Sequence, residues 1–160
     1  MAISLPKTIK FVITDFDGVV TDNCVYIDSK GDMTRKVNFK DIIAFYQLKK
    51  NGIKVGIISG EENSAINIIR EKLGVDEVHQ NVRIKIDVFK SIIEKYNLSL
   101  DEVVYIGDDI NDLDILKYIK YPITVPNAVE KIKTLEAIQI TTYKGGEGAF
   151  REVADALIGG

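Results

Sequence analysis

The stretch FVITDFDGVV, Phe11 to Val20, joins an apolar run to a pair of acids. The apolar residues 11–13 are followed by Asp15 and Asp17, one residue apart, and then by Gly18. This pattern is typical of a buried strand that ends in a turn. Ligands bind at that edge of an open α/β sheet, and strand alternation would point both carboxylates to one side. Because close like charges need a cation or a proton between them, the pattern predicts either a metal site or a plain acidic turn.

The composition is that of an ordinary globular protein. The chain has 160 residues, of which 46% are hydrophobic and 28% charged, so we expect one domain over residues 1–160. The formal net charge of −3 argues against nucleic acid or an anionic membrane as the main partner.

The low numbers of cysteine and histidine limit the kinds of metal site that the chain can form and indicate a reducing cellular compartment. Cys24 is the only cysteine, which excludes an internal disulfide and a thiolate metal cluster. His79 is the only histidine, which excludes a zinc site with several histidines. The N-terminus has no apolar leader and no later stretch is long and apolar enough to span a bilayer, so we expect a soluble cytoplasmic protein.

Strand and helix patterns alternate along most of the chain. Strands are expected at 11–13, 53–58, 75–79, 102–106, 121–125 and 138–142, and helices at 41–50, 61–72, 84–96, 112–118, 128–135 and in a last segment ending near residue 158. Repeated strand-then-helix units predict an α/β fold of three layers, Rossmann-like, with a mostly parallel sheet and helices on both faces.

One segment, at about residues 23–39, interrupts this rhythm. It alternates in short pieces around Ser29-Lys30-Gly31-Asp32, which predicts a β-hairpin too short to be a domain. It is either a surface flap or a strand pair offered to neighbouring subunits.

Polar residues follow four predicted strands. They are Asp15 and Asp17, Ser59, Lys85, and the group Asp108, Asp109 and Asp112. Taken alone, Ser59 could cap a helix, Lys85 could be solvated, and the pair at 108–109 could cap the next helix. Their order, and the edge of the sheet that they share, instead favour one crevice.

This order resembles the haloacid dehalogenase superfamily of phosphotransferases, whose four motifs match DFDGV, the serine of IISG, Lys85 and GDDIND. The resemblance implies that Asp15 is a nucleophile that forms an aspartyl-phosphate and that Asp17 is the general acid and then the general base. It further implies that Asp15, Asp108 and the backbone carbonyl of Asp17 bind Mg²⁺, since hard oxygen ligands select this ion.

The remaining motif residues receive supporting roles from the same resemblance. Ser59, Gly60 and Lys85 would hold the phosphoryl oxygens, and Asp109 and Asp112 would support the metal ligands from behind. A carboxylate that approaches a phosphate dianion is repelled by it, which is why a divalent cation and a lysine are needed.

Within the superfamily the chain is similar to phosphatases of 3-deoxy-2-keto sugar acids. These have no cap domain, carry a hairpin after the first motif, and share a tail that reads GGEGAFRE here at residues 145–152. The family implies a homotetramer built by the hairpins, in which a neighbour's surface closes each active site, and a flexible tail at about 143–160. It also implies a sugar-acid phosphate as substrate, with Asn38, Asp41, Glu61, Lys72 and Arg151 among the binding residues.

The branch of this family is indicated by two positions. Enzymes acting on KDO 8-phosphate carry arginine where this chain has Glu61, whereas Glu61 and Lys72 match the enzyme acting on KDN 9-phosphate. Glu61 cannot pair with a sugar carboxylate but can accept from hydroxyls or an amine. The resemblance therefore favours a nine-carbon substrate, KDN 9-phosphate or N-acetylneuraminate 9-phosphate.

Two other classes of protein fit parts of the pattern. One is a non-catalytic assembly or regulatory module of the kind fused to CMP-sialic acid synthetases. The other is a phospho-acceptor signalling domain, in which the acid pair and the acceptor lie on different strands. Steady Mg²⁺-dependent turnover of a phosphate ester would exclude both.

Overall fold

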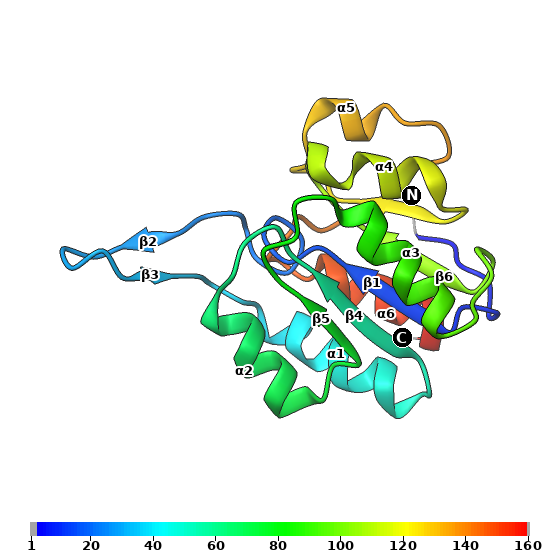
Figure 1. Cartoon of the computed structure of the whole chain (residues 1–160), viewed down its shortest axis with the longest axis horizontal. Helices are drawn as coiled ribbons and strands as arrows, with labels where there is room; N and C mark the ends of the chain where they lie inside the picture. The colour runs from blue at the N-terminus through cyan, green and yellow to red at the C-terminus, as the bar shows by residue number, and fades with distance from the viewer. Residues whose placement is uncertain (1–2, 160) are drawn as a thin grey trace.

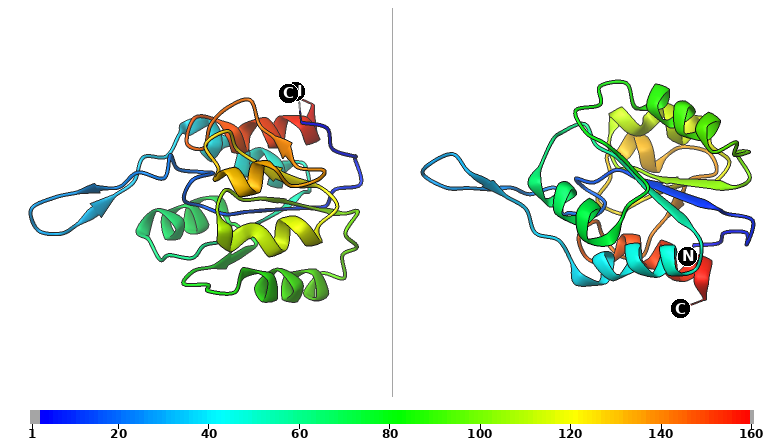
Figure 2. Two further views of the ribbon diagram at one scale, coloured as in Figure 1. Left: turned by 90° about the horizontal axis from the view of Figure 1, so that it is seen from above. Right: turned by 60° about the horizontal axis from the view of Figure 1, so that its bottom comes forward.

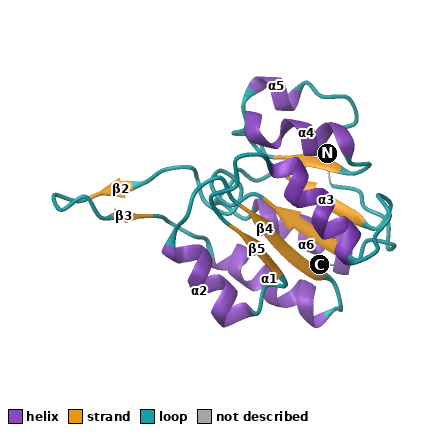
Figure 3. Cartoon of the chain, in the orientation of Figure 1, coloured by secondary structure: helices purple, strands orange, loops and turns teal. Residues whose placement is uncertain are grey.

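The computed structural model describes residues 3–159 and contains a six-stranded parallel sheet in the order β5-β4-β1-β6-β7-β8. Figures 1 and 3 show this sheet at the centre of the molecule. Its strands are β1 (Phe11–Thr14), β4 (Lys54–Ile58), β5 (Glu77–His79), β6 (Val103–Ile106), β7 (Pro122–Thr124) and β8 (Gln139–Ile140). The predicted α/β class and mostly parallel sheet are confirmed.

β1 occupies the middle of the sheet and all four of its residues are buried. It pairs with β4 on one side, where Ile13 lies opposite Gly56, and with β6 on the other, where Ile13 lies opposite Tyr105. The chain order changes direction around β1, and such a switch point opens a crevice at the carboxyl ends of the strands. The residues that follow β1 therefore enter a ready-made ligand site.

Helices cover both faces of the sheet (Figure 2). On one face lie α1 (Phe39–Lys50) and α6 (Ala149–Ile158), whose Phe45 and Phe150 rings pack with centroids 4.4 Å apart. On the other lie α3 (Lys85–Lys95) and α4 (Leu113–Tyr118). The predicted three layers are present, because each helix buries one apolar stripe against the sheet.

The helix ends depart by a few residues from the predicted ones, and their caps explain why. α1 begins at Phe39 because the side chain of Asn38 accepts from the amide of Lys40. α2 (Ser64–Leu73) begins after Asn63, whose side chain accepts from Ile66, rather than at Glu61. A short 3₁₀ helix, η1 (Ile110–Asp112), precedes α4, and α5 (Glu130–Lys133) is shorter than predicted.

The predicted hairpin projects from the body as an arm (Figure 1). We call residues 23–38 the arm. Its strands, β2 (Tyr26–Ile27) and β3 (Met33–Thr34), pair antiparallel but have only two residues each. A bridge between Thr21 and Val37 closes its base.

The glycine-rich tail, predicted to be flexible, ends here in the packed helix α6. Its first turn is held by Asp41 of α1, whose two oxygens accept from the amides of Gly148 and Arg151 at 3.2 and 2.9 Å. Burial raises the pKa of Asp41 to about 6, although these amides oppose the shift. Among the described residues, no helix is both long and apolar enough to cross a membrane.

Candidate active site

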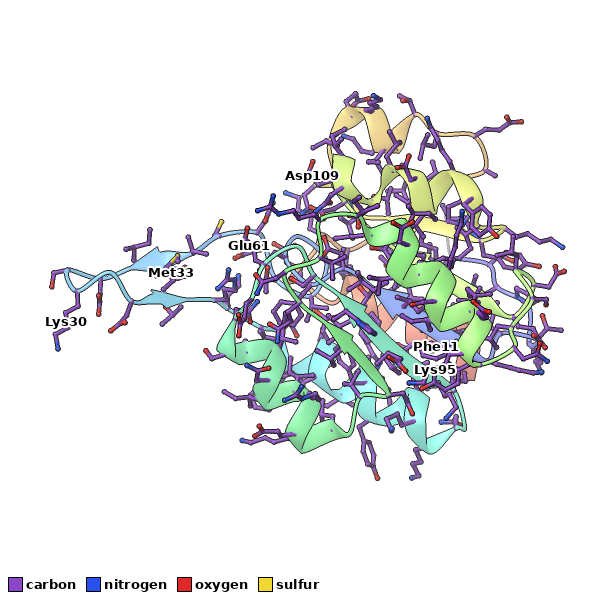
Figure 4. The ribbon with its side chains drawn as sticks, viewed as in Figure 1. Phe11, Lys30, Met33, Glu61, Lys95 and Asp109 are labelled. Atoms are coloured by element: carbon purple, nitrogen blue, oxygen red, sulfur yellow. The ribbon has the colours of Figure 1, made fainter. Side chains whose placement is uncertain are left out.

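A cavity of about 280 Å³ opens at the carboxyl ends of β1, β4 and β6. Its lining is Asp15, Asp17, Asn23, Val25, Arg35, Ser59, Gly60, Glu61, Asp108, Asp109 and Asn111. Figure 4 shows Glu61 and Asp109 at the end of the body from which the arm leaves, and Phe11 and Lys95 at the opposite end. Three of the four predicted motifs thus meet in the lining of one cavity, and the fourth, Lys85, contacts its floor.

Asp15 lies at the floor of the cavity and is almost completely buried. Its Oδ1 accepts from Nζ of Lys85 at 2.9 Å and from the amide of Phe16 at 2.7 Å. Burial and the nearby carboxylate of Asp112 raise the pKa of Asp15 well above its usual value, and Lys85 opposes them. A second positive charge beside Asp15 would therefore favour its ionised form.

Lys85 is not a solvated lysine, because its side chain is completely buried. It is the first residue of α3, and its Nζ lies 2.8 Å from Oδ1 of Asp112 as well as 2.9 Å from Asp15. Burial alone would lower the pKa of Lys85, but the carboxylates of Asp112 and Asp15 outweigh burial and raise it. Lys85 is thus a fixed cation beneath the cavity.

Asp112 is saturated by hydrogen bonds from four groups. Its Oδ1 accepts from Lys85 and from the hydroxyl of Tyr105 at 2.6 Å, and its Oδ2 accepts from the amides of Asp108 and Asp109. The carboxylate therefore shapes the loop after β6 and holds Lys85 in place. Asp109, in turn, caps η1 by accepting from the amide of Ile110.

The acids at the floor fit a divalent metal ion. Oxygens of Asp15, Asp108 and Asp112 lie within 4.8 Å of one another, and Oδ1 of Asp108 is buried with no hydrogen-bond partner. Burial and the carboxylates of Asp112 and Asp109 raise the pKa of Asp108 to about 7. Because Asp112 is already saturated, Asp15 and Asp108 are the side chains available as hard oxygen ligands.

Asp17 lines the same cavity with a more exposed side chain than Asp15, and two residues outside the motifs hold it. Its Oδ1 accepts from Nε of Arg35 at 2.8 Å and from the hydroxyl of Thr21 at 3.2 Å. Arg35 comes from the arm. Its only signal in the sequence is a positive charge in a hairpin, which most often marks a solvated surface residue.

Ser59 does not cap α2. It is buried, its hydroxyl donates to the carbonyl of Glu61 at 2.8 Å, and Asn63 is the cap instead. Its neighbours Gly60 and Glu61 lie on the cavity wall beside Asn111. The loop after β4 therefore presents small polar groups to the cavity.

Four residues predicted to bind substrate lie outside this lining. Asn38 caps α1, and Asp41 holds the first turn of α6. Lys72 is exposed near the end of α2, and Arg151 pairs with Asp155 at 2.7 Å beside a second cavity. Within one copy of the chain, none of the four reaches the acids.

Comparison with known proteins agrees with this geometry. The family model for haloacid dehalogenase-like hydrolases matches residues 38–120, just over half of the chain. A curated relative, the 3-deoxy-D-manno-octulosonate 8-phosphate phosphatase KdsC of Escherichia coli K12, is 28% identical over 98% of this chain and 82% of its own length.

Solved structures give the same result. The 3-deoxy-D-manno-octulosonate 8-phosphate phosphatase of Moraxella catarrhalis, solved with a magnesium ion, a phosphate ion and KDO, superposes with a TM-score of 0.89. It is 30% identical over 95% of this chain and 87% of its own. The cobalt-bound phosphatase of Haemophilus influenzae has a TM-score of 0.87 and 27% identity, covering 95% of this chain and 88% of its own.

Proposed function

This chain belongs to the haloacid dehalogenase-like hydrolases and is a phosphatase, and on that premise we propose that it hydrolyses the phosphate monoester of a 3-deoxy-2-keto sugar acid. One observation carries the proposal. The buried carboxylate of Asp15 is held 2.9 Å from Lys85, beside the unpartnered oxygen of Asp108, at the floor of an open cavity.

In the first half of the reaction Asp15 attacks the phosphorus atom. A P–O bond forms to Asp15 while the bond to the sugar oxygen breaks, which gives an aspartyl-phosphate. Lys85 offsets charge as the two anions approach each other, because its ammonium group already lies against Asp15. Ser59 also lines the cavity, and its hydroxyl would have to turn from the carbonyl of Glu61 to donate to a phosphoryl oxygen.

Asp17 serves both halves of the reaction. It gives a proton to the departing sugar oxygen, becomes a carboxylate, and then takes a proton from the water that attacks the aspartyl-phosphate. Its side chain is 22% exposed against 7% for Asp15, which suits a group that must reach the leaving oxygen in the cavity.

A divalent cation completes this charge balance. Bound Mg²⁺ would offset the charge of the phosphoryl group and of the Asp15 carboxylate. Asp15, Asp108 and the backbone carbonyl of Asp17 would hold it, with Asp109 and Asp112 supporting the loop that carries Asp108.

The relatives and the cavity wall support sugar acids of different length. The relatives named above are phosphatases of the eight-carbon KDO 8-phosphate. Glu61 on the wall of the cavity supports a nine-carbon substrate, KDN 9-phosphate or N-acetylneuraminate 9-phosphate, whose hydroxyls or amide it could accept from.

The arm supports assembly into a homotetramer. Val25, Ile27 and Met33 are 44%, 65% and 57% exposed although they are apolar, and the two short strands leave their edges unpaired within the chain. Such edges pair with copies of themselves in closed symmetry. A neighbour's surface would then close each cavity, and Lys72 or Arg151 would act at the substrate only in a neighbour's cavity or after movement of α6.

Phosphate release over a panel of esters tests the function. The panel contains KDO 8-phosphate, KDN 9-phosphate, N-acetylneuraminate 9-phosphate, common sugar phosphates and p-nitrophenyl phosphate. We expect Mg²⁺-dependent turnover that prefers a sugar acid, stops with EDTA, and is abolished by Asp15→Asn without change of fold.

A measurement of stability tests the metal site without any substrate. Mg²⁺ should raise the melting temperature of the wild type more than that of Asp108→Asn. Hydrolysis by Asp15→Asn at the wild-type rate, or full activity after exhaustive chelation, would overturn the mechanism. The absence of turnover on every ester would favour the non-catalytic module or the phospho-acceptor domain.

A further inference from the structure

We propose that Arg35 of the arm is a positioning residue for Asp17, which holds one carboxylate oxygen so that the other faces the leaving group. This inference rests on the proposed phosphatase mechanism, in which Asp17 is the general acid. It adds the arm to the machinery of the active site, in addition to its proposed place in assembly.

The contact between the two side chains is short and partly shielded from water. Nε of Arg35 lies 2.8 Å from Oδ1 of Asp17, and the side chains are 11% and 22% exposed. Both line the cavity. A charge-assisted hydrogen bond in such surroundings is stronger and more directional than a solvated ion pair.

The two oxygens of Asp17 differ in their surroundings. Oδ1 accepts from Arg35 and from the hydroxyl of Thr21, whereas no described residue donates to Oδ2. The transferable proton therefore belongs on Oδ2. When the P–O bond breaks, its electron pair stays on the sugar oxygen, the proton of Oδ2 passes to that oxygen, and Asp17 is left as a carboxylate.

The position of Arg35 is itself fixed by the base of the arm. Thr21 is buried, accepts from the amides of Gly18 and Asn23, and pairs with Val37 in the bridge that closes the arm. Arg35 lies two residues before Val37. The acid and its arginine are therefore attached to one small hydrogen-bonded unit.

A second use of Arg35 would be to bind an anionic group of the substrate. It is the one cationic side chain in the cavity lining among the described residues, and the sugar acid carries a carboxylate. The structure favours positioning, since Nε is already directed at Asp17. The two roles predict that a variant of Arg35 loses activity on different phosphate esters.

The test compares leaving groups. Nitrophenolate departs without protonation, whereas a sugar alkoxide needs the acid. We therefore measure kcat/KM, which reports the steps up to formation of the aspartyl-phosphate, for p-nitrophenyl phosphate, a sugar-acid phosphate and a sugar phosphate without a carboxylate. In Arg35→Gln we expect both sugar esters to lose about a hundredfold, at least tenfold more than the aryl ester.

Two further variants control for general damage. Lys36→Gln removes the neighbouring cation of the arm, which pairs with Asp22 at 3.1 Å and lies outside the cavity lining, and should keep wild-type kinetics. Arg35→Lys restores a donor and should recover part of the loss on the sugar esters.

Equal losses on all three esters, or no loss on any, would overturn the positioning role. A rise in KM limited to the ester with a carboxylate would overturn it in favour of substrate binding. If the wild type hydrolyses other sugar phosphates but no sugar-acid phosphate, the proposed substrate fails, and the leaving-group comparison still tests Arg35 on those esters.

Discussion

Gly18 lies directly against the carboxylate of Asp108: a Cβ atom at residue 18 would come to 1.9 Å from Oδ2 of Asp108. The backbone of Gly18 also has a φ of +91°, a conformation that residues other than glycine rarely adopt. The turn after β1 and the loop after β6 thus approach so closely that only glycine fits between them.

Gly18→Ala should displace Asp108 and with it the proposed metal site. Because misplacing a catalytic group by about 1 Å can cost a hundredfold, we expect kcat/KM to fall by about a hundredfold. The Mg²⁺ concentration needed for half-maximal activity should also rise. Steady-state kinetics over a series of Mg²⁺ concentrations measure both effects.

Gly31→Ala is the matched control for this substitution. Gly31 has φ of +87°, nearly that of Gly18, but a Cβ atom there meets nothing within 4 Å. The variant should lose about 1 kcal/mol of stability from backbone strain and keep its activity. Equal activity of the two alanine variants would show that the contact with Asp108 is unimportant.

Lys85→Met should be inactive and unstable at neutral pH. Without the ammonium group, the carboxylates of Asp15 and Asp112 remain buried without their shared cation, which typically costs about 3–5 kcal/mol. We expect kcat to fall by at least about a hundredfold. Urea unfolding and phosphate release measure the two losses.

The stability loss of this variant should shrink in acid. A buried carboxyl with a raised pKa, such as Asp15, favours the folded state at low pH and disfavours it as pH rises, so the loss should be smaller at about pH 5 than at about pH 8. Lys90→Met, an exposed position on the same helix, should show neither loss. A loss that does not depend on pH would contradict the electrostatic explanation.

Asp41 should make the protein more stable in mild acid. Its pKa in the folded chain, about 6, lies above the usual 3.8, so the folded state binds a proton more tightly than the unfolded state. The resulting stabilisation is complete below about pH 4 and is lost as pH rises through about 6, up to roughly 3 kcal/mol. Urea unfolding at several pH values measures it.

Two variants distinguish the pH-dependent stabilisation by Asp41 from that of the other carboxylates. Asp41→Asn should remove that part of the pH dependence, and should also lose stability because its amide cannot accept from both Gly148 and Arg151. Asp87→Asn, at an exposed position on α3, should follow the wild-type profile. A wild-type profile in Asp41→Asn would assign the dependence to other groups.

Lysines on the arm should dissociate the proposed tetramer. The double variant Val25→Lys/Ile27→Lys places charges among apolar side chains that a neighbour would bury, and burying such charges is costly. Light scattering should show a tetramer for the wild type and smaller species for the variant, with less activity on the sugar-acid phosphate. Asp32→Lys, at an exposed position in the turn of the arm, controls for added charge. A fully active wild-type monomer would defeat the proposal.

The acids of the site could be predicted from the sequence because each follows its strand directly. Asp15 and Asp108 come one and two residues after β1 and β6, and neighbouring parallel strands bring their carboxyl ends together. Strand patterns and local spacing therefore suffice to place them. The boundaries of the helices were less predictable, because caps such as Asn63 depend on single hydrogen bonds.

The contacts of Arg35 and Asp41 could not be predicted from the sequence. Arg35 reaches Asp17 across 18 residues from an arm with no periodic core, so neither spacing nor burial marks it. Asp41 was predicted to bind substrate, but its carboxylate contacts the first turn of α6, more than a hundred residues later. Contacts of this kind follow from the tertiary fold rather than from a local pattern.

Gly145 packs against the turn after β1, as Asp108 does, although it lies more than a hundred residues later in the chain. A Cβ atom on Gly145 would lie 1.8 Å from the carbonyl oxygen of Gly18, and Asn127 links the two by donating to Gly18 and accepting from Gly145. During synthesis, the turn after β1 therefore cannot complete its packing until residues 127–146 have left the ribosome. A nascent chain can form β1 early, but the turn beside Asp15 gains these contacts only after residues 127–146 have been made.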